Sequence, residues 1–322
     1  MSASSAQSLS QTTPTLSRLQ GDALLEVTGR DAMTFLHNQA SCDLKQLHPG
    51  TASYGTFCNP QGRVLADFIA LALGPERILL RLRRDIMDST LAALGRFAMF
   101  SKVTLRAAAD EWELLGCRGG GTAETLRPLF PALPETDLAW SGEAGALVLQ
   151  LDGKSECFEV WLSRSEQPAL QEQLEEALPA ASEADWEAAN LRRGIARITA
   201  ATTGELLPQQ LNYDLSGHIN FRKGCYPGQE VIARMHYKGK AKRRMLLVQL
   251  PAGTAASAGE PLYLQGKERP AAQIVNAAIA DDGTALALIT TTRLAAEEGL
   301  RLAPAGEQTV EVLELPYPVP FG

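Results

Sequence analysis

Cys225 lies in the segment of the chain whose residue types are best suited to chemistry. Lys223 precedes it by two positions, and Gly224, Pro227 and Gly228 surround it with flexible or turn-forming backbone. A nearby cation favours the thiolate, which is the nucleophilic and metal-binding form of cysteine. Glycines on both sides would let a ligand approach the backbone closely. The spacing therefore predicts a reactive or ligating thiol at Cys225, assisted by Lys223.

The remaining cysteines show no spacing that predicts a disulfide or a zinc site. No pair has C-x-x-C spacing, and the nearest histidines, His218 and His236, lie seven and eleven residues from Cys225. We therefore expect no pre-formed metal site. We expect reduced thiols, mostly buried as small hydrophobic residues, at Cys42, Cys58, Cys117 and Cys157.

Residues 222–244 form a strongly basic stretch in an acidic chain. They contain eight Lys or Arg and one acid, Glu230, so the local charge is +7 against -7 for the whole chain. Aromatic residues, among them Tyr226 and Tyr237, are interleaved with the cations. Such polarisation favours a polyanionic ligand, either a phosphate backbone or a chain of carboxylates. The alternative is a solvated linker surface without a ligand.

Hydrophobic periodicity predicts an α+β protein, because short apolar runs alternate with helical spacing. The predicted strands cover 23–27, 53–58, 64–73, 78–82, 102–105, 147–151 and 157–162, and the predicted helices lie within 31–39, 86–97, 170–178 and 182–194. Ser182, with Asp185 three residues later, is typical of a helix N-terminus. After Arg244 a small β-barrel is predicted from the runs 245–250, 261–264, 272–280 and 285–289.

These patterns divide the chain into three segments. Residues 1–17 are rich in Ser, Thr and Gln, and we expect a disordered leader. Residues 18–240 are expected to form two interlocked α+β domains with breaks near 107–112 and 180–186, and residues 241–322 the barrel and a tail. No run approaches the roughly 18 apolar residues of a membrane helix, so we expect a cytoplasmic protein without a membrane anchor.

The segment around Cys225 resembles the signature of the YgfZ family, folate-binding proteins related to the aminomethyltransferase (T protein) of the glycine cleavage system. The specific block is Lys-Gly-Cys-Tyr-Pro-Gly-Gln-Glu at 223–230. The resemblance covers roughly residues 20–317 and also rests on the segments 27–36, 58–64, 97–103, 208–212 and 313–317.

The resemblance implies a fold, a ligand and a role. The fold would be the T-protein cloverleaf, in which two interlocked α/β domains and a C-terminal β-barrel surround a channel that holds tetrahydrofolate. The role would be the support of iron–sulphur enzymes, including those that thiolate or methylthiolate tRNA. Partners would be iron–sulphur enzymes or assembly proteins, with tRNA reached only indirectly. The family's signature cysteine and its preceding lysine map onto Cys225 and Lys223.

The resemblance also assigns folate contacts, with two departures from the family. Trp186 maps onto a folate-contacting tryptophan, although from its residue type alone it equally fits a core position. Asp22, which cannot stack on a pterin, stands where the family has another such tryptophan. Arg192 stands where many relatives carry a Glu that can pair with the pterin, and Arg192 cannot accept hydrogen bonds. Folate would then bind weakly, in another pose, or with Arg192 serving the glutamate tail. The remaining expected contacts are Tyr226, Gln229, Glu230 and Arg234.

Asp67 aligns with the catalytic aspartate of the T protein. It interrupts an otherwise apolar strand, which predicts either a carboxyl with a raised pKa in a pocket or a satisfied Asp on an edge strand.

Three functions follow from these residues: a folate-dependent maintenance factor for iron–sulphur proteins, a folate-dependent one-carbon (aminomethyl) transferase, and a non-catalytic RNA-binding module. The reactive cysteine favours the first of these, because aminomethyl transfer needs no thiol beside the ligand. Whether the protein turns over a substrate is left open by the sequence.

Overall fold

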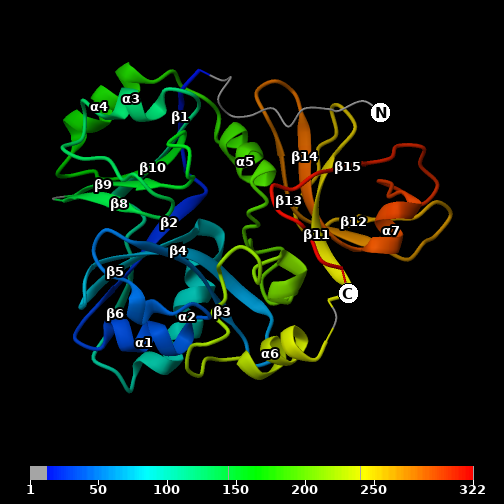
Figure 1. Ribbon diagram of the computed structural model, residues 1–322, viewed down its shortest axis with the longest axis horizontal. Coiled ribbons are helices and arrows are strands. Elements are labelled where there is room, and N and C mark those ends of the chain that lie inside the picture. Colours follow the sequence, from blue (N-terminus) through cyan, green and yellow to red (C-terminus); the bar gives the residue numbers. More distant parts are fainter. Residues whose placement is uncertain (1–12, 144, 240, 322) are drawn as a thin grey trace.

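The computed structural model describes residues 13–143, 145–239 and 241–321. They form a mixed α/β structure with three five-stranded sheets, in which every paired strand is antiparallel (Figure 1). Sheet I has the order β3 (Ala52–Cys58), β4 (Val64–Gly74), β5 (Arg77–Arg83), β2 (Asp22–Thr28) and β6 (Thr104–Ala107). Sheet II has the order β1 (Thr15–Arg18), β7 (Trp112–Arg118), β10 (Cys157–Ser163), β9 (Ala146–Gln150) and β8 (Trp140–Glu143). Sheet III has the order β12 (Pro261–Leu262), β13 (Ala272–Ile279), β14 (Ala285–Thr292), β11 (Arg243–Gln249) and β15 (Glu311–Leu313).

Sheets I and II are buried on both faces, and the period of two along their strands sorts the side chains. Leu25 and Leu80 of sheet I point to the core that contains α1 and α2, whereas Leu24 and Leu79 point to a second core shared with sheet II. Because both faces of these sheets are buried among apolar side chains, the sequences of their strands are nearly continuous hydrophobic runs. The outer faces are covered by α1 (Ala32–Gln39) and α2 (Met87–Ala98) on sheet I, and by α3 (Thr122–Leu126) and α4 (Pro168–Ala177) on sheet II.

The predicted disordered leader differs from the structure at its end. Residues 1–12 lie outside the described residues, but Thr15–Arg18 form strand β1, which pairs with β7. Leu16 is buried beside Leu115 and Phe158 in the core of sheet II. A short strand at an open sheet edge needs only one or two apolar side chains facing the core, and a Ser/Thr-rich composition hides such a strand.

Sheet III is an open ladder, so the predicted closed barrel is not seen among the described residues. Its edge strands β12 and β15 have two and three residues, too few to close a barrel by a continuous ladder. Isolated β-bridges link Tyr263 to Arg301 and Arg301 to Thr309. These bridges extend the strand pairing beyond sheet III without closing it into a barrel. Helix α7 (Arg293–Glu298) follows β14 directly.

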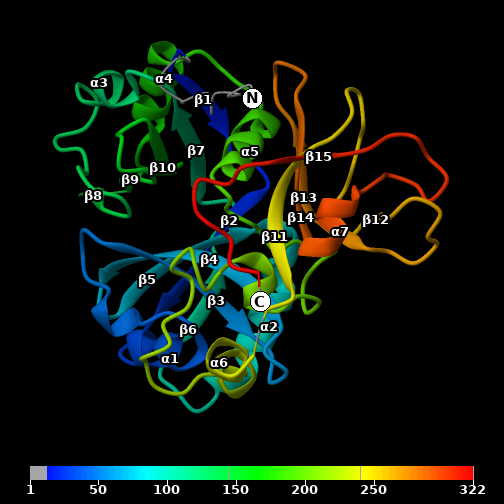
Figure 2. The ribbon, with the colours of Figure 1, turned by 45° about the vertical axis from the view of Figure 1, so that its right-hand side comes forward.

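Helix α5 (Glu183–Arg192) joins the two-sheet unit to sheet III, where it packs on β13 (Figure 2). Its predicted start is confirmed, since the Ser182 hydroxyl accepts a hydrogen bond from the Asp185 N–H at 3.0 Å. Short 3₁₀ turns lie at Leu44–Gln46, Arg84–Ile86 and Pro208–Leu211. None of the helices in the described ranges has the length and apolar character to cross a membrane.

Candidate functional site

The Cys225 segment is a loop that leads into helix α6 (Gln229–Tyr237). Gly228 precedes the helix with φ +79°, and a Cβ there would lie 2.4 Å from the carbonyl oxygen of Asn59 in the β3–β4 turn. Only glycine allows both this conformation and this approach. The contact fixes the loop against sheet I and leaves the Cys225 side chain exposed.

Lys223 anchors the start of the loop rather than standing free beside the thiol. Its side chain is buried, and its ammonium donates hydrogen bonds to the carbonyl oxygens of His37 and Ala40 at the C-terminal end of α1. A cation here satisfies helix-end carbonyls and complements the helix dipole. The Tyr226 ring lies 5.0 Å from the same ammonium. Burial lowers the pKa of Lys223 to about 8.

Cys225 differs from the other four thiols in exposure. It is exposed, whereas Cys42, Cys58, Cys117 and Cys157 are buried. Burial raises the pKa of Cys42 and of Cys58 to about 12, that of Cys157 to about 11, and that of Cys117 further still. Because the thiolate is the reactive species, reactivity toward solutes is expected at Cys225 alone.

His37 was not predicted as a site residue, yet it lies against the loop. Its side chain is buried, its Nδ1 is 3.2 Å from Asp43 Oδ1, and its Nε2 is 4.0 Å from the position that a Cβ on Gly224 would take. Burial, and then the charge of Lys223, lower the pKa of His37. The imidazole is therefore neutral at pH 7 and adds no second cation beside the loop. A histidine in the last turn of a predicted helix was the only signal in the sequence.

The expected folate contacts on and before α6 vary in exposure. Tyr226 is buried, and burial raises the pKa of its phenol. Gln229 is half-buried at the first position of α6. Glu230 and Arg234 are exposed on the helix. These residues are near the Cys225 loop by chain position, and three of them face outward to some degree.

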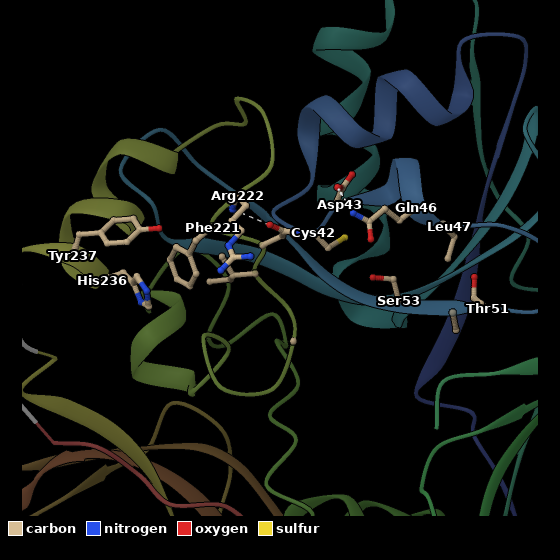
Figure 3. A pocket seen from close by; sticks show the side chains of 14 residues that line it. Cys42, Asp43, Gln46, Leu47, Thr51, Ser53, Phe221, Arg222, His236 and Tyr237 are labelled. Atoms are coloured by element: carbon tan, nitrogen blue, oxygen red, sulfur yellow. Dashed lines mark hydrogen bonds between the residues drawn. The ribbon is translucent and has the colours of Figure 1, made fainter. Parts of the chain in front are cut away.

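A cavity of about 690 Å³ lies beside this loop (Figure 3). Phe221 and His236 stack at one end, with ring centroids 3.7 Å apart and planes at 16°, and Tyr237 meets them edge-on. Polar side chains and the apolar side chains of Leu47, Ala52 and Ile219 line the rest. The lining residues are Cys42, Asp43, Gln46, Leu47, Thr51, Ala52, Ser53, Gly217, Ile219, Asn220, Phe221, Arg222, His236 and Tyr237.

Trp186 and Arg192 lie on α5, apart from the Cys225 loop. Trp186 is only 1% exposed, and its ring fills the space above Gly116 of β7, where a Cβ would lie 2.5 Å from the indole. Arg192, at the last position of α5, is half-buried. Helices α5 and α6 are well separated in both ribbon views (Figures 1 and 2).

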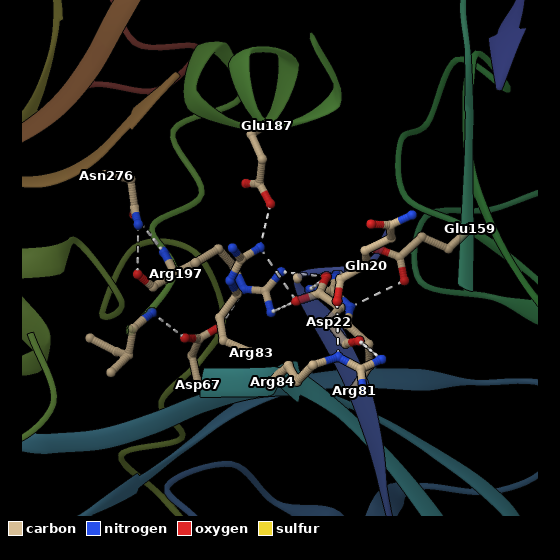
Figure 4. A network of polar contacts seen from close by, with 12 residues as sticks. Gln20, Asp22, Asp67, Arg81, Arg83, Arg84, Glu159, Glu187, Arg197 and Asn276 are labelled. Carbon is tan, nitrogen blue, oxygen red and sulfur yellow. Dashed lines mark hydrogen bonds and ion pairs between the residues drawn. The ribbon is translucent and has the colours of Figure 1, made fainter. Parts of the chain in front are cut away.

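Asp67 is a member of a buried ionic network at the junction of the three sheets (Figure 4). One carboxylate oxygen accepts from Arg197 Nε at 2.8 Å and the other from the Ile198 N–H at 2.5 Å. The Arg197 guanidinium also binds both oxygens of Asp22, at 3.0 and 3.2 Å. Asn276 of sheet III exchanges two 2.8 Å hydrogen bonds with the Arg197 backbone. Burial raises the pKa of Asp67 to about 7.

The network continues through two arginines of β5. Arg81 contacts Asp22 at 3.3 Å and binds Glu159 of sheet II through two of its nitrogens. Arg83 pairs with Glu187 on α5. Burial raises the pKa of Glu187 to about 7. Asp22 thus accepts hydrogen bonds from Arg197 and forms ion pairs with Arg81 and Arg83.

Comparison with known proteins gives two kinds of relationship. Residues 22–143 match the family described as the GCVT N-terminal domain. The "tRNA-modifying protein YgfZ" of Pectobacterium carotovorum subsp. carotovorum is 29% identical over 96% of this chain and 93% of its own length. The protein of the same name from Shigella boydii serotype 4 is 28% identical over 94% of this chain and 93% of its own. The chain is similar to these YgfZ proteins over nearly its whole length.

The fold agrees with this relationship. The glycine cleavage system aminomethyltransferase T from Bartonella henselae superposes with a TM-score of 0.78 at 17% identity, covering 96% of this chain and 87% of its own. The chain therefore shares the overall arrangement of a T protein. Its ionic network was missed by sequence reasoning, because the partners are scattered from Asp22 to Asn276 and only Asp67 interrupts an apolar run conspicuously.

Proposed function

We propose that the chain is a folate-binding protein that supports iron–sulphur enzymes, among them enzymes that thiolate or methylthiolate tRNA. Support comes from the match with proteins named as tRNA-modifying over nearly the whole chain. In this proposal tRNA is reached through the iron–sulphur enzymes.

The exposure of Cys225 is the observation that carries the proposed role. Its loop is tied down on both sides, by Lys223 on α1 and by Gly228 on the β3–β4 turn, so the thiol is presented on a defined backbone. Such a thiol can act as a transient cluster ligand, as a persulphide carrier or through a mixed disulphide. Lys223 would act as a positioning residue, since its ammonium is already bonded to α1.

We propose that folate binds beside α5, next to Arg83 and Glu187. Arg83 Nε is buried there without a hydrogen-bond partner among the described residues, and the Glu187 carboxyl lies next to it. A pterin offers adjacent carbonyl and amino groups, which could accept from Arg83 and donate to Glu187. Half-buried Arg192 at the end of α5 would hold the glutamate tail. Trp186 would support this site from the protein interior, because its ring packs directly against Gly116.

The chain's organisation supports two further proposals. Strand β6 ends at Ala107 and β7 begins at Trp112, so the change from sheet I to sheet II falls at the proposed domain break. On this basis we propose two interlocked domains up to residue 240 and a C-terminal unit over 241–322, with the first boundary moved from 18 to Thr15 because β1 pairs with β7. The reduced thiols support a proposed cytoplasmic location.

A one-carbon transferase receives less support. Both oxygens of Asp67 accept hydrogen bonds from the protein, and the side chain is buried. A general base should be within reach of the substrate proton, and Asp67 is instead committed to Arg197 and Ile198.

The thiol proposal is tested in cells that lack the chromosomal copy. The fraction of methylthiolated tRNA nucleosides is measured by mass spectrometry after expression of the parent, Cys225→Ser or Cys117→Ala. We expect Cys225→Ser to fail and Cys117→Ala, which changes a buried thiol, to restore the modification. Full restoration by Cys225→Ser at equal protein level would exclude a chemical role for this thiol.

The folate proposal is tested by titration of the purified chain with tetrahydrofolate, followed by tryptophan fluorescence. Saturable quenching is expected in the parent and reduced quenching in Trp186→Phe. Glu187→Gln should weaken binding about tenfold, as expected for a lost charge-assisted hydrogen bond. Absence of binding in the parent would remove folate from the proposal and leave the Cys225 role standing.

A further inference from the structure

The cavity beside the Cys225 loop is not explained by the proposed function. It contains none of the residues expected to bind folate, and Cys225 does not line it. Its volume of about 690 Å³ is that of a small-molecule site. Its composition, with stacked aromatic rings at one end and polar groups at the other, suits a ligand that combines a planar ring with hydrogen-bonding edges.

Four cations of the basic stretch have no ion-pair partner in the described parts of the chain. In the basic stretch, Lys223 is bonded to α1, and Arg244 is paired with Asp214 at 2.6 Å. Arg243 donates to the Thr290 carbonyl oxygen. The cations left exposed and without a carboxylate are Arg222, Arg234, Lys238 and Lys242.

These cations lie before, on and after α6 in the chain. Arg222 lines the cavity itself. Arg234 lies on α6 and Lys238 directly follows its last residue, Tyr237, so the three residues are near one another at the C-terminal end of the helix. Tyr237 is 65% exposed, so one of the aromatic rings at the cavity rim is accessible from solvent. Glu230 is the only acid from 222 to 244.

The acidic group in the cavity is already engaged. Asp43 Oδ2 accepts from Gln46 Nε2 at 2.9 Å, and Oδ1 faces His37. In Figure 3 the Gln46 amide lies between Asp43 and Ser53 and reaches into the cavity. Amide and hydroxyl groups of this kind can read the edge of a base or a sugar hydroxyl.

We propose that this cavity and the exposed side of α6 form a binding site for single-stranded nucleic acid. One base stacks at Tyr237 and the Phe221–His236 pair, while Arg222, Arg234, Lys238 and Lys242 follow the phosphates. Proteins that bind single strands combine these two elements, a stacking platform and a cationic track. A chain of carboxylates, such as a folate polyglutamate, would use the cations but not the aromatic platform. The proposal stands independently of Cys225 and of folate.

The test is fluorescence anisotropy of the full chain with fluorescein-labelled 12-mers of oligouridine and oligothymidine. Four phosphate contacts on a single strand predict a slope of about -2.8 for log K against log salt, so binding should weaken about 20-fold between 50 and 150 mM NaCl. A preference for oligouridine would identify RNA as the source, and a preference for oligothymidine DNA.

Variants separate stacking from charge. Tyr237→Ala should weaken binding about tenfold with an unchanged salt slope. Arg222→Gln combined with Lys238→Gln should reduce the slope by about 1.4. Matched controls are Phe100→Ala, an exposed aromatic elsewhere, and Lys267→Gln, an exposed lysine beside sheet III; both should bind as the parent does. Thermal unfolding checks that each variant is folded.

Three results would overturn the proposal. The first is no saturable binding of either oligonucleotide at 50 mM NaCl. The second is parental affinity in folded Tyr237→Ala, because a platform that contributes nothing is no base site. The third is displacement of oligouridine by pentaglutamate as effectively as by unlabelled oligouridine, which would define a general polyanion surface.

Discussion

Arg197 joins two buried carboxylates from different strands, and its removal should be costly. In Arg197→Met, Asp67 keeps only the Ile198 N–H, and Asp22 loses two of its closest contacts while retaining Arg81 and Arg83. Removing one partner of a buried ion pair destabilises a protein by about 3–5 kcal/mol, because a buried charge is left unpaired. For a chain of this size that corresponds to a decrease in Tm of roughly 4–8 °C.

The pKa of Asp67 determines how the loss of stability in Arg197→Met depends on pH. The pKa of Asp67 is about 7 in the folded state against an ordinary value of 3.8, so between these values the folded state binds more protons than the unfolded state. Its contribution to the free energy of unfolding therefore falls as pH rises through this window. Without the positive charge of Arg197, the pKa of Asp67 in the folded state rises further. The deficit of Arg197→Met should thus be smaller at pH 5 than at pH 8.

The measurement is urea unfolding of the parent, Arg197→Met, Asp67→Asn and the double variant, at both pH values. The double variant should lose less than the sum of the single variants, since the charge left unpaired by the first change is removed by the second. Arg293→Gln, which removes an exposed pair with Glu297, should show no measurable change. A loss below about 1 kcal/mol in Arg197→Met at pH 8, or strict additivity in the double variant, would refute a stabilising network.

Two further predictions concern close contacts outside the network. Gly116→Ala places a Cβ about 2.5 Å from the Trp186 indole and should cost about 1–3 kcal/mol by overpacking, whereas Gly74→Ala, with open space around it, should not; urea unfolding and near-UV circular dichroism compare them. Lys223→Met removes two hydrogen bonds to α1 and should cost about 1–3 kcal/mol at pH 7. Because burial lowers the folded pKa of Lys223 to about 8 from 10.5, the folded parent binds fewer protons between these values, and its stability should rise with pH in that window. Lys223→Met should lack this rise; an identical pH profile in both proteins would contradict the burial of the ammonium.

The sequence predicted those helices and strands whose position follows from a single local pattern. The Ser182 cap of α5 and the apolar runs of β4 and β5 are examples. Strand β1 was not predicted because its Ser/Thr-rich composition obscures its two buried residues. The strand forms by pairing with β7, which lies nearly a hundred positions away in the chain. Helix α6 was missed because it lies in the charged stretch that was interpreted for its chemistry.

The candidate site shows the same limit at the level of side chains. The sequence indicated Cys225 because its glycines and cations are neighbours in the chain, and the structure confirms that this thiol is exposed. It could not indicate that Lys223 points to α1 or that Trp186 is closed by Gly116, because both depend on contacts between distant segments.

The position of Asp22 in the buried network has a physical consequence for ligand binding. Asp22 binds Arg197 and contacts Arg81 and Arg83, so it gathers three cations into the interior where sheets I, II and III meet. A planar ligand cannot stack on this cluster, and opening it would expose buried charges at a cost of several kcal/mol. A folate that binds this chain must therefore use the rim of the network, at Arg83 Nε and Glu187, rather than displace its centre. Glu187→Gln should then affect folate binding more than stability, whereas Arg197→Met should affect stability first.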